Sequence, residues 1–504
     1  MNYLLLLLIV IPFVGCPVTY FAGRVSKQGA VFSALGFTLI TLAISLYSYS
    51  FVYAATPQLG KYPLAEPLTE NFTWISLNNF SLNFPLGLDG LSGPLVLVTA
   101  LLTMLVVIGS RAQIKVHQAE YYALLLFMEA SVMGVFTVLN LIAFYIFWEL
   151  ALIPIFFFVG IWGGDKKRYA AMKFMLFTFA GSTVMLLGFL SLYLATPISF
   201  NTFDMAYLSG KVPLEIQYLP LLATFIGFGM KLPVVPFHSW LPDTYRAAPA
   251  PITVMLSGVL VKMGGYGLIR ISIELFPQAA QQYAWVFIAI GVVTMFYGAI
   301  VAVLSKDLKT MFAYTSINEM GFVIVGAFAT VASGNLLGIE GAIFQMFTHA
   351  LAVGALFMLS GYITVQAGTT EISKLAGMRL TMPRTAGILI LASAAAMAVP
   401  PFANFVAELL VISAAATAYS FLVVIIFVPV LTGAYFLWMI KRTILGTLAG
   451  KPGDTQRHDI RKSDAWIFLL YIAPLLGITV FSYLILGPSA NVAQWIVNLV
   501  KGAP

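Results

Sequence analysis

Long windows almost free of charged residues recur along the chain and restrict what it can fold into. Of its 504 residues, 61% are hydrophobic and only 9% are charged, whereas soluble domains carry about 25% charged residues. A helix needs about 20 apolar residues to cross a membrane. The pattern predicts an all-α polytopic membrane protein with about fourteen transmembrane helices, at residues 3–22, 29–52, 90–110, 121–138, 140–162, 170–195, 217–232, 250–273, 283–304, 309–330, 338–364, 385–410, 417–440 and 466–487.

Basic residues gather in alternate loops between these segments. The odd-numbered loops hold most of the 26 lysines and arginines, and such loops normally face the cytoplasm. We therefore expect both termini outside, in an energy-coupling membrane, most simply that of a bacterial or archaeal cell. The net charge of +7 then reflects topology, and nucleic acid is excluded as a partner.

The N-terminal residues form a hydrophobic segment that resembles a signal peptide. It lacks a basic start, and Pro17 follows Cys16, so a retained transmembrane helix is expected. Because Cys16 is the only cysteine, an intrachain disulfide and a cysteine metal cluster are excluded.

The seventh segment is interrupted at residues 229–243, GMKLPVVPFHSWLPD. Pro233 and Pro236 remove helical hydrogen bonds there, and broken backbone in a membrane must be buried in protein or line a wet cavity. Lys231 stands at the break. Because a lysine is costly at this depth in a membrane, we expect it to have a function.

His238 lies on the cytoplasmic side of the same break. Its unperturbed pKa of about 6.5 would suit proton transfer. A hydrogen-bonding role beside Asp243 explains it equally well.

Two glutamates occur in the preceding segments. Glu149, in FYIFWELALIPIFF, lies roughly 14 Å along its helix, close to mid-membrane. A carboxylate there either takes up a proton or pairs with a buried cation. Glu129 is the second candidate. For both, a neutral, hydrogen-bonded glutamate that fixes helix packing is the alternative.

The eighth segment carries Lys262 near its middle, with Gly264, Gly265 and Gly267 nearby. The glycines are expected to permit close helix contact. A buried ammonium must find a counter-charge or release its proton, so packing alone explains Lys262 poorly.

Further ionisable residues follow in segments ten to twelve. Glu319 lies in the tenth and His349 in the eleventh, where a relay role and a satisfied core histidine are equally plausible. The twelfth is interrupted at Pro400 and Pro401, and Glu408 follows about two turns later.

The two interruptions occupy matching places in two groups of five segments. An odd number of crossings per group gives the groups opposite orientation, so we expect two inverted five-helix repeats with discontinuous helices and an ion path between them. The predicted organisation is N-terminal transmembrane helices at 1–120, a first repeat at 121–276, a second repeat at 277–442, and a cytoplasmic loop with the last transmembrane helix at 443–504.

Several motifs together resemble the subunit 4 (M-type) family of antiporter-like subunits of respiratory complex I, which is related to Mrp-type antiporter subunits. They are FWELALIP, WGG followed by RYAAMKF, KLPVVPFHSWLPD, LVKMGGYGLIR and QMFTHALAVGALFMLSG, and the resemblance covers roughly residues 87–442. It implies a fourteen-helix fold and a proton path along a central hydrophilic axis.

The resemblance also implies roles for individual residues. Glu149 would pair with Lys231, Lys262 would be the central relay, and Glu408 would be the exit-side group. His349 matches a family histidine. The chain differs from the family at two places. Asn318–Gly321 replace the usual Ser-His-Met-Gly, so Glu319 stands at the position of the relay histidine. Thr244 and Tyr245 replace the usual Ala-His.

On this interpretation the chain moves protons through a water-linked Glu/Lys/His relay. It holds no metal and no cofactor of its own, because quinone and redox cofactors would belong to partner subunits of a complex I-like assembly. The electron donor stays open among NADH, ferredoxin and a reduced deazaflavin. Alternatives are a subunit of an Mrp-type sodium/proton antiporter or of a membrane-bound hydrogenase, an independent secondary transporter, and a purely structural subunit.

Overall fold

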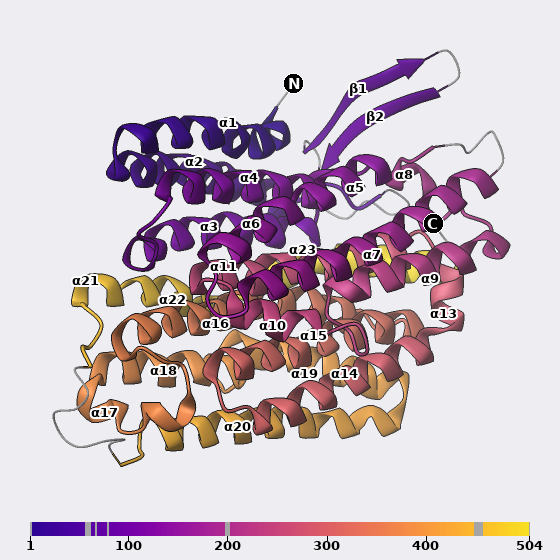
Figure 1. Ribbon diagram of the computed structural model, residues 1–504. Coiled ribbons are helices and arrows are strands. Elements are labelled where there is room, and N and C mark those ends of the chain that lie inside the picture. Colours follow the sequence, from indigo (N-terminus) through magenta and orange to yellow (C-terminus); the bar gives the residue numbers. More distant parts are fainter. Residues whose placement is uncertain are drawn as a thin grey trace.

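Helices cross the molecule side by side and form almost all of its structure (Figure 1). The computed structural model describes residues 3–55, 62–65, 68–77, 80–196, 202–447 and 457–502. Twelve helical segments of this part are long and apolar enough to cross a membrane, and they coincide with twelve of the predicted crossings. The other two predicted crossings, 217–232 and 385–410, are the interrupted ones.

The first half of the chain contributes α1 to α10. Their bounds are α1 Leu4–Val25, α2 Lys27–Ala54, α3 Ser92–Gln113, α4 Gln118–Thr137, α5 Leu141–Leu150, α6 Leu152–Trp162, α7 Lys167–Ala195, α8 Met205–Leu208, α9 Leu214–Lys231 and α10 Trp240–Ala247. The predicted break of the seventh crossing is therefore the gap between α9 and α10.

The eighth crossing is continuous but irregular. It consists of α11 (Ala250–Met255), a π-helical turn (Leu256–Leu260), α12 (Val261–Gly267) and a second π-helical stretch (Leu268–Ile273). Such π-helical turns are rare and often occur at functional sites. Nothing in the sequence pattern predicted them.

The second half contributes α13 to α23. Their bounds are α13 Pro277–Gln282, α14 Ala284–Leu304, α15 Leu308–Ser333, α16 Leu337–Ala367, α17 Met378–Thr381, α18 Pro383–Ala396, α19 Ala403–Ala418, α20 Phe427–Thr443, α21 Lys462–Ala465, α22 Ile467–Val480 and α23 Tyr483–Val500, with 3₁₀ turns at Ile372–Leu375 and Ser420–Ile426. The gap between α18 and α19 is the predicted second interruption.

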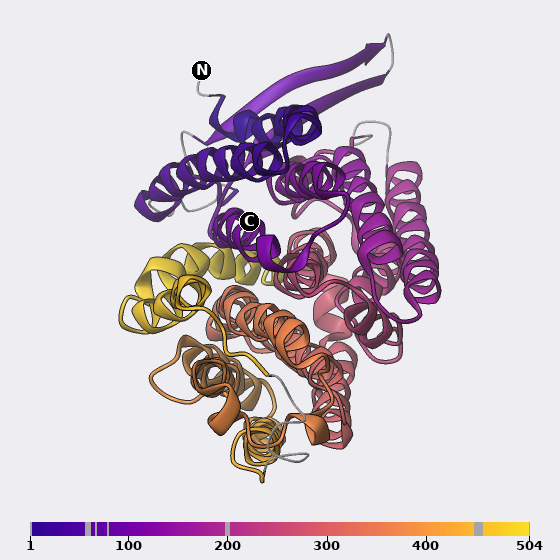
Figure 2. The same ribbon diagram turned by 60° about the vertical axis from the view of Figure 1, so that its left-hand side comes forward.

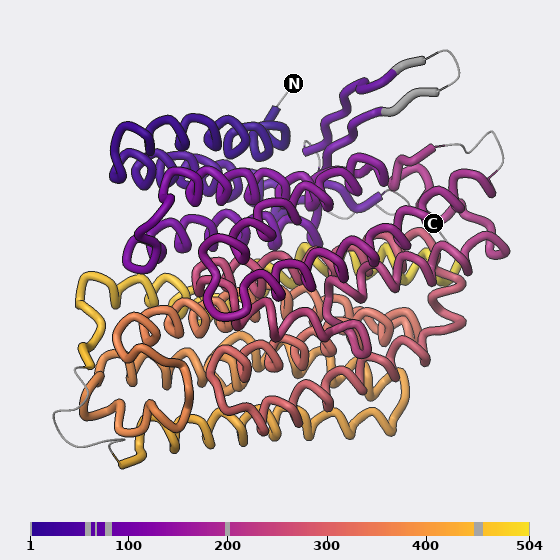
Figure 3. Tube along the Cα trace, in the orientation of Figure 1, coloured from indigo at the N-terminus to yellow at the C-terminus, as the bar shows by residue number. Residues whose placement is uncertain are grey.

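Early and late parts of the chain lie on opposite sides of the bundle. The N-terminal helices lie on one side of the bundle and α17 to α20 on the other, as the Cα trace shows (Figure 3). The last helices return to lie between them (Figures 1 and 2), where α23 contacts α2 and α16.

Burial separates central from peripheral helices. The most apolar windows of residues 250–273 and of α16 are 100% buried, against 33% for α1 and α2. Lys262 and His349 lie on these enclosed helices, so protein and not lipid surrounds them.

Two elements of the fold were not predicted from the sequence. The segment between the second and third predicted crossings contains an antiparallel hairpin of β1 (Thr69–Leu77) and β2 (Phe80–Gly87). Apolar residues alternate along β2 in the sequence FSLNFPLG, a pattern that indicates a strand.

The second is the 18-residue helix α23, which begins at Tyr483 within the last predicted crossing and continues to Val500. Its apolar residues recur at helical spacing and are buried, among them Ile485, Val492, Ile496 and Leu499. The last crossing itself ends at Val480, before the predicted 487. The predicted cytoplasmic loop occupies the start of residues 443–504. Residues 448–456 of this loop lie outside the part of the chain that the structure describes.

The two ends of the chain lie near the same loop. Backbone N–H groups of Leu5 and Leu6 donate to the carboxylate of Glu70 in β1. At the other end of the chain, the ring of Trp495 in α23 packs against Tyr62, with 5.9 Å between centroids. Both termini therefore belong to the face that carries the hairpin.

Candidate functional site

Lys231 is the last residue of α9, and the helix dipole favours a positive charge at the C-terminal end of a helix. Its Nζ has no hydrogen-bond partner among the residues described. Its Nζ lies 4.3 Å from the centroid of the Trp148 ring, a cation–π contact. Among the described residues, no ion pair or hydrogen bond joins Lys231 to Glu149, the residue next to Trp148 in α5. Lys231 is buried and Glu149 half-buried.

Helices of the second half of the chain contact the interrupted segment after Lys231. The backbone N–H of Val235 donates to Thr294 Oγ1 of α14 at 3.2 Å. The Nζ of Lys309, in the first turn of α15, donates to the Ala248 carbonyl at 2.9 Å. The second half of the chain thus contributes to the position of the break in the first.

His238 and Asp243 do not pair. The Asp243 carboxylate pairs with Lys173 of α7 at 2.7 Å, while the half-buried His238 ring packs edge-on against Tyr297, with centroids 4.7 Å apart. His238 Nδ1 has no hydrogen-bond partner in the part of the chain described.

Lys262 lies at the centre of the enclosed helices. Its Nζ donates to the carbonyl of Ser257, in the first π-helical turn, and contacts Nδ1 of His349 in α16. A Cβ added at Gly264 would lie 2.8 Å from the backbone nitrogen of Leu232. The predicted close approach is confirmed there, and it brings the helix of Lys262 against the end of α9.

Glu319 and Glu408 lie beyond Lys262, on α15 and α19. Gln345 Nε2 of α16 donates to Glu319 Oε2. Glu319 interacts electrostatically with Lys262 and with Glu408. All of these side chains are buried. The interior therefore holds a row of buried ionisable groups on neighbouring helices, namely Lys262, His349, Glu319 and Glu408.

Glu129 is buried but stands apart from this row. Neither carboxylate oxygen forms a hydrogen bond to a residue that the structure describes. Among the described groups, no ion pair includes it. The alternative role of Glu129, a neutral glutamate that fixes helix packing through hydrogen bonds, therefore has no hydrogen-bond partner among these residues.

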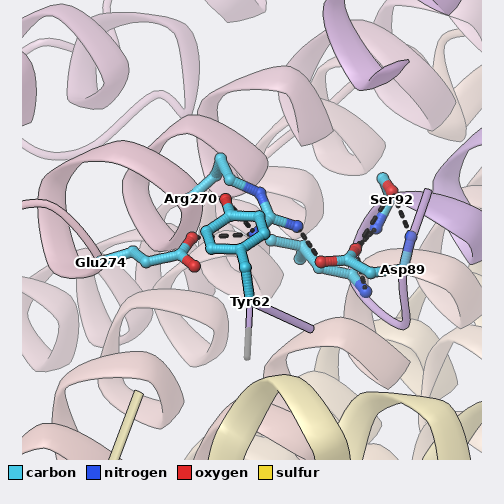
Figure 4. A network of polar contacts seen from close by, with 6 residues as sticks. Tyr62, Asp89, Ser92, Arg270 and Glu274 are labelled. Atoms are coloured by element: carbon cyan, nitrogen blue, oxygen red, sulfur yellow. Dashed lines mark hydrogen bonds and ion pairs between the residues drawn. The ribbon is translucent and has the colours of Figure 1, made fainter. Parts of the chain in front are cut away.

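A second buried charge network was not predicted from the sequence. Figure 4 shows Arg270 between the carboxylates of Asp89 and Glu274. Arg270 Nη1 donates to Glu274 Oε2 at 2.9 Å and to the Tyr62 hydroxyl at 3.0 Å, while Asp89 Oδ1 accepts from the backbone and hydroxyl of Ser92. The network joins the first helices to the end of residues 250–273.

Arg270 does not stand out in the sequence, because a single charge near the end of a predicted crossing is common. The spacing of Arg270 and Glu274, one turn apart on a helix, could have indicated the ion pair.

A polar cleft of about 840 Å³ opens where α11 and α15 begin. Its lining includes Arg246, Lys306, Asp307, Lys309 and Glu371. The Ala250 end of the helix that carries Lys262 also lines it.

Comparison with known proteins adds an independent line of evidence. Residues 138–432 match the sequence model described as "NADH:quinone oxidoreductase/Mrp antiporter, TM". The chain belongs to this family. It is a multi-pass integral membrane protein with the fold of the antiporter-like subunits, and the predicted resemblance is confirmed.

Individual members are similar over most of the chain. F(420)H(2) dehydrogenase subunit M of Methanosarcina mazei is 34% identical over 511 residues, with 98% of each chain covered. NADH-quinone oxidoreductase subunit M of Rickettsia prowazekii is 36% identical, with 82% of each covered. A chain of respiratory complex I from Thermus thermophilus superposes with a TM-score of 0.84 at 25% identity, covering 98% of this chain and 99% of that one.

Proposed function

We propose that this chain is the proton-translocating, antiporter-like subunit of a complex I-type oxidoreductase and that protons pass along the buried row from Glu149 to Glu408. The observation that supports the proposal is the burial of two lysines, Lys231 and Lys262, in the protein interior, with a histidine in contact with the second. A buried ammonium is costly to keep, and a role in charge movement explains that cost.

The first step of the proposed relay is an exchange between Glu149 and Lys231. Trp148 and the end of α9 stabilise the lysine while it is charged. When Glu149 is protonated or moves away, the ammonium loses its counter-charge and can pass a proton on.

The central step is transfer through Lys262. Its contact with His349 provides a second nitrogen that can hold the proton, and its electrostatic interaction with Glu319 leads toward Glu408. Glu408 is the proposed exit-side group. Glu319 would take the role of a relay histidine, while His238 and Glu129 are accessory candidates only.

The polar cleft beside Ala250 is the proposed cytoplasmic opening, because basic residues of the odd-numbered loops surround it. Lys306 and Lys309 come from one such loop and Arg246 from another. This orientation puts both termini outside. We further propose that residues 121–276 and 277–442 form two inverted units, with the interrupted helices at their interface.

Energy for pumping would come from partner subunits. The names of the relatives from M. mazei and R. prowazekii describe subunits of an F(420)H(2) dehydrogenase and of an NADH-quinone oxidoreductase. We propose a comparable assembly here, in which other membrane subunits contact this chain and quinone and redox cofactors belong to the partners.

The decisive test replaces Lys262 by methionine in the intact complex, reconstituted in liposomes. We expect proton pumping to be lost while the complex still assembles. Lys374→Met, at an exposed surface lysine paired with Glu371, is the matched control and should pump normally. Normal pumping by Lys262→Met would refute the relay. Loss of assembly in this variant would favour a structural role.

A second candidate function is a subunit of an Mrp-type sodium/proton antiporter, which the description of the matching family also names. It predicts sodium-dependent proton movement without any electron donor. Co-purification with redox subunits from mild detergent would argue against it.

A further inference from the structure

The buried network at the end of residues 250–273 contains one cation and two carboxyl groups (Figure 4). The side chains of Asp89 and Glu274 are 0% exposed, and that of Arg270 is 1% exposed. If both carboxyl groups were ionised, the three side chains would leave one negative charge in the interior. A buried charge without compensation is costly, so the network requires one further positive charge.

Hydrogen bonds show that Asp89 is the ionised partner of the arginine. Its Oδ1 accepts from the backbone N–H groups of Leu91 and Ser92, both at 3.0 Å, and from the Ser92 hydroxyl at 3.1 Å. Its Oδ2 pairs with Arg270 Nη2. Because hydrogen bonds to a carboxylate favour its charged form, Asp89 and Arg270 together form a neutral ion pair.

Glu274 is much less well supplied with donors. Its Oε2 accepts from Arg270 Nη1 at 2.9 Å, and the same nitrogen also donates to the Tyr62 hydroxyl at 3.0 Å. Its Oε1 has no hydrogen-bond partner in the described part of the chain. A hard metal cation binds several oxygens at once, whereas a proton binds one. The free oxygen of Glu274 therefore suits a proton.

The surroundings of Glu274 supply no other compensating charge among the residues described. The ionisable groups that interact with it or with its arginine are Asp89, Tyr62, Tyr266 and Arg270. The neighbouring α13 and α23, which packs on Tyr62, carry no charged residue. The adjacent α9 is charged only near its ends, at Glu215 and Lys231, and no ion pair of the described residues joins these to the network.

Tyr62 connects the network to the surface. It is half-buried, whereas Asp89, Arg270 and Glu274 are buried. It belongs to the segment between α2 and β1, on the face that carries the hairpin, and this face is the outer one in the proposed orientation. A proton at Glu274 therefore lies one side chain away from the outer surface.

The same helix connects Glu274 to the centre of the protein. Polar side chains recur along it at every fourth residue, at Lys262, Tyr266, Arg270 and Glu274, and residues four apart are neighbours on a helix surface. The Tyr266 hydroxyl is buried and has no hydrogen-bond partner among the residues described, and its ring centroid lies 5.7 Å from the guanidinium carbon of Arg270.

We propose that Glu274 binds a proton delivered from Lys262 and releases it at the outer face, as an outlet separate from Glu408. This inference rests on the proposed function, because the relay would supply the proton. Uptake leaves Lys262 as a neutral amine and converts the Glu274 carboxylate into a carboxylic acid, and release to outside water restores the carboxylate. Arg270 and Asp89 remain an ion pair and position the group.

Infrared spectroscopy of the intact, detergent-purified complex tests the proton itself. The carbonyl stretch of a protonated carboxyl group shifts in D₂O, and Glu274→Gln should lose one such band. Glu215→Gln, at an exposed carboxylate of α9, is the control and should keep it. Asp89→Asn should also lose the band although Glu274 is present, because Arg270 then takes the glutamate as its counter-charge and keeps it ionised.

Unfolding and pumping measurements test the role of the proton. A glutamine is neutral, as the protonated glutamate is, so Glu274→Gln should unfold at the same temperature as the unmodified complex near neutral pH. Closing one of two outlets should reduce its proton pumping in liposomes to roughly half, since a positioned proton carrier is lost. Glu215→Gln should pump normally.

The outcomes separate this inference from the proposed function. An unchanged carboxyl band in folded Glu274→Gln, or pumping equal to that of Glu215→Gln, overturns the outlet. A much lower unfolding temperature for Glu274→Gln would identify an ionised partner of Arg270 and would also overturn it. Normal pumping by Lys262→Met overturns the relay, whereas the infrared band of Glu274 would persist in that variant.

Discussion

Lys262 and His349 are separated by 87 residues in sequence, yet Lys262 Nζ contacts Nδ1 of His349 in the enclosed interior. While Lys262 is charged, its ammonium has no lone pair, so Nδ1 accepts and the ring proton is on Nε2. Nε2 itself has no partner among the residues described. The imidazole therefore has one nitrogen toward Lys262 and one free to exchange a proton.

The first prediction concerns His349. A hydrogen bond to a charged group contributes about 1.5–3 kcal/mol, so His349→Leu should lower proton pumping by roughly tenfold or more. His349→Gln keeps an acceptor for Lys262 but cannot titrate, and we expect it to remain impaired. Pumping in liposomes is the measurement. Full activity in His349→Gln would make the histidine a structural partner instead of a relay group.

The second prediction concerns the contact between Lys231 and Trp148. A desolvated cation–π contact is worth about 2 kcal/mol, so Trp148→Leu should reduce pumping roughly tenfold because the charged lysine is less stable. Trp148→Phe should have a smaller effect. The control is Trp438→Leu, at an exposed ring that contacts Arg442 on the surface, and it should pump normally. Equal pumping by both leucine variants would show that Trp148 has no such role.

The sequence was sufficient to predict the interrupted helices and most of the row. Prolines and isolated charges stand out in apolar segments, because each is costly in a membrane. The sequence therefore identified three candidate relay residues individually: Lys231, Lys262 and Glu408. Family resemblance suggested that Glu149 and Lys231 belong together.

Contacts between distant segments were not predictable in this way. Nothing in the sequence pattern links Gln345 to Glu319, and the hydrogen bond between them depends on how α15 packs against α16. Asp89 and Arg270 are 181 residues apart, and each looked like an ordinary residue at the end of a segment. Their pairing becomes evident only when the helices are packed together.

The third prediction concerns this network. Removing one partner of a buried ion pair costs about 3–5 kcal/mol, because the remaining charge is left uncompensated. Arg270→Met leaves both Asp89 and Glu274, which are 0% exposed, without their cation, and it should markedly lower the thermal unfolding temperature of the purified complex. Arg168→Met, at an exposed position, should leave that temperature unchanged. A similar unfolding temperature for both variants would contradict a stabilising role.

The fourth prediction concerns Asp459, which precedes α21 and lies outside the membrane-spanning segments. Its carboxylate accepts hydrogen bonds from the backbone N–H groups of Arg384 and Thr385, in the first turn of α18, at 2.9 and 3.0 Å. It thus caps a helix that begins 76 residues upstream of it, at Pro383. Losing a cap of this kind costs about 1 kcal/mol.

The pH dependence of this cap follows from the charge of Asp459. Partial burial alone would raise the pKa of its carboxyl, but the hydrogen bonds from Arg384, Thr385 and Ile460 outweigh that effect and lower the pKa below its ordinary value of 3.8. The ionised form is therefore favoured by folding. Its contribution is complete above the unfolded-state pKa and is lost as pH falls through the lower folded-state pKa.

Asp459→Asn should accordingly lower the unfolding temperature of the complex by a constant amount between pH 5 and 8. The difference from the unmodified protein should shrink below about pH 4, near the ordinary pKa of aspartate. Asp165→Asn, at an exposed residue, serves as the control. The difference in unfolding temperature between Asp459→Asn and the unmodified protein could instead grow on acidification. That result would contradict a carboxylate stabilised in its ionised form, and it would show that the cap does not depend on the charge of Asp459.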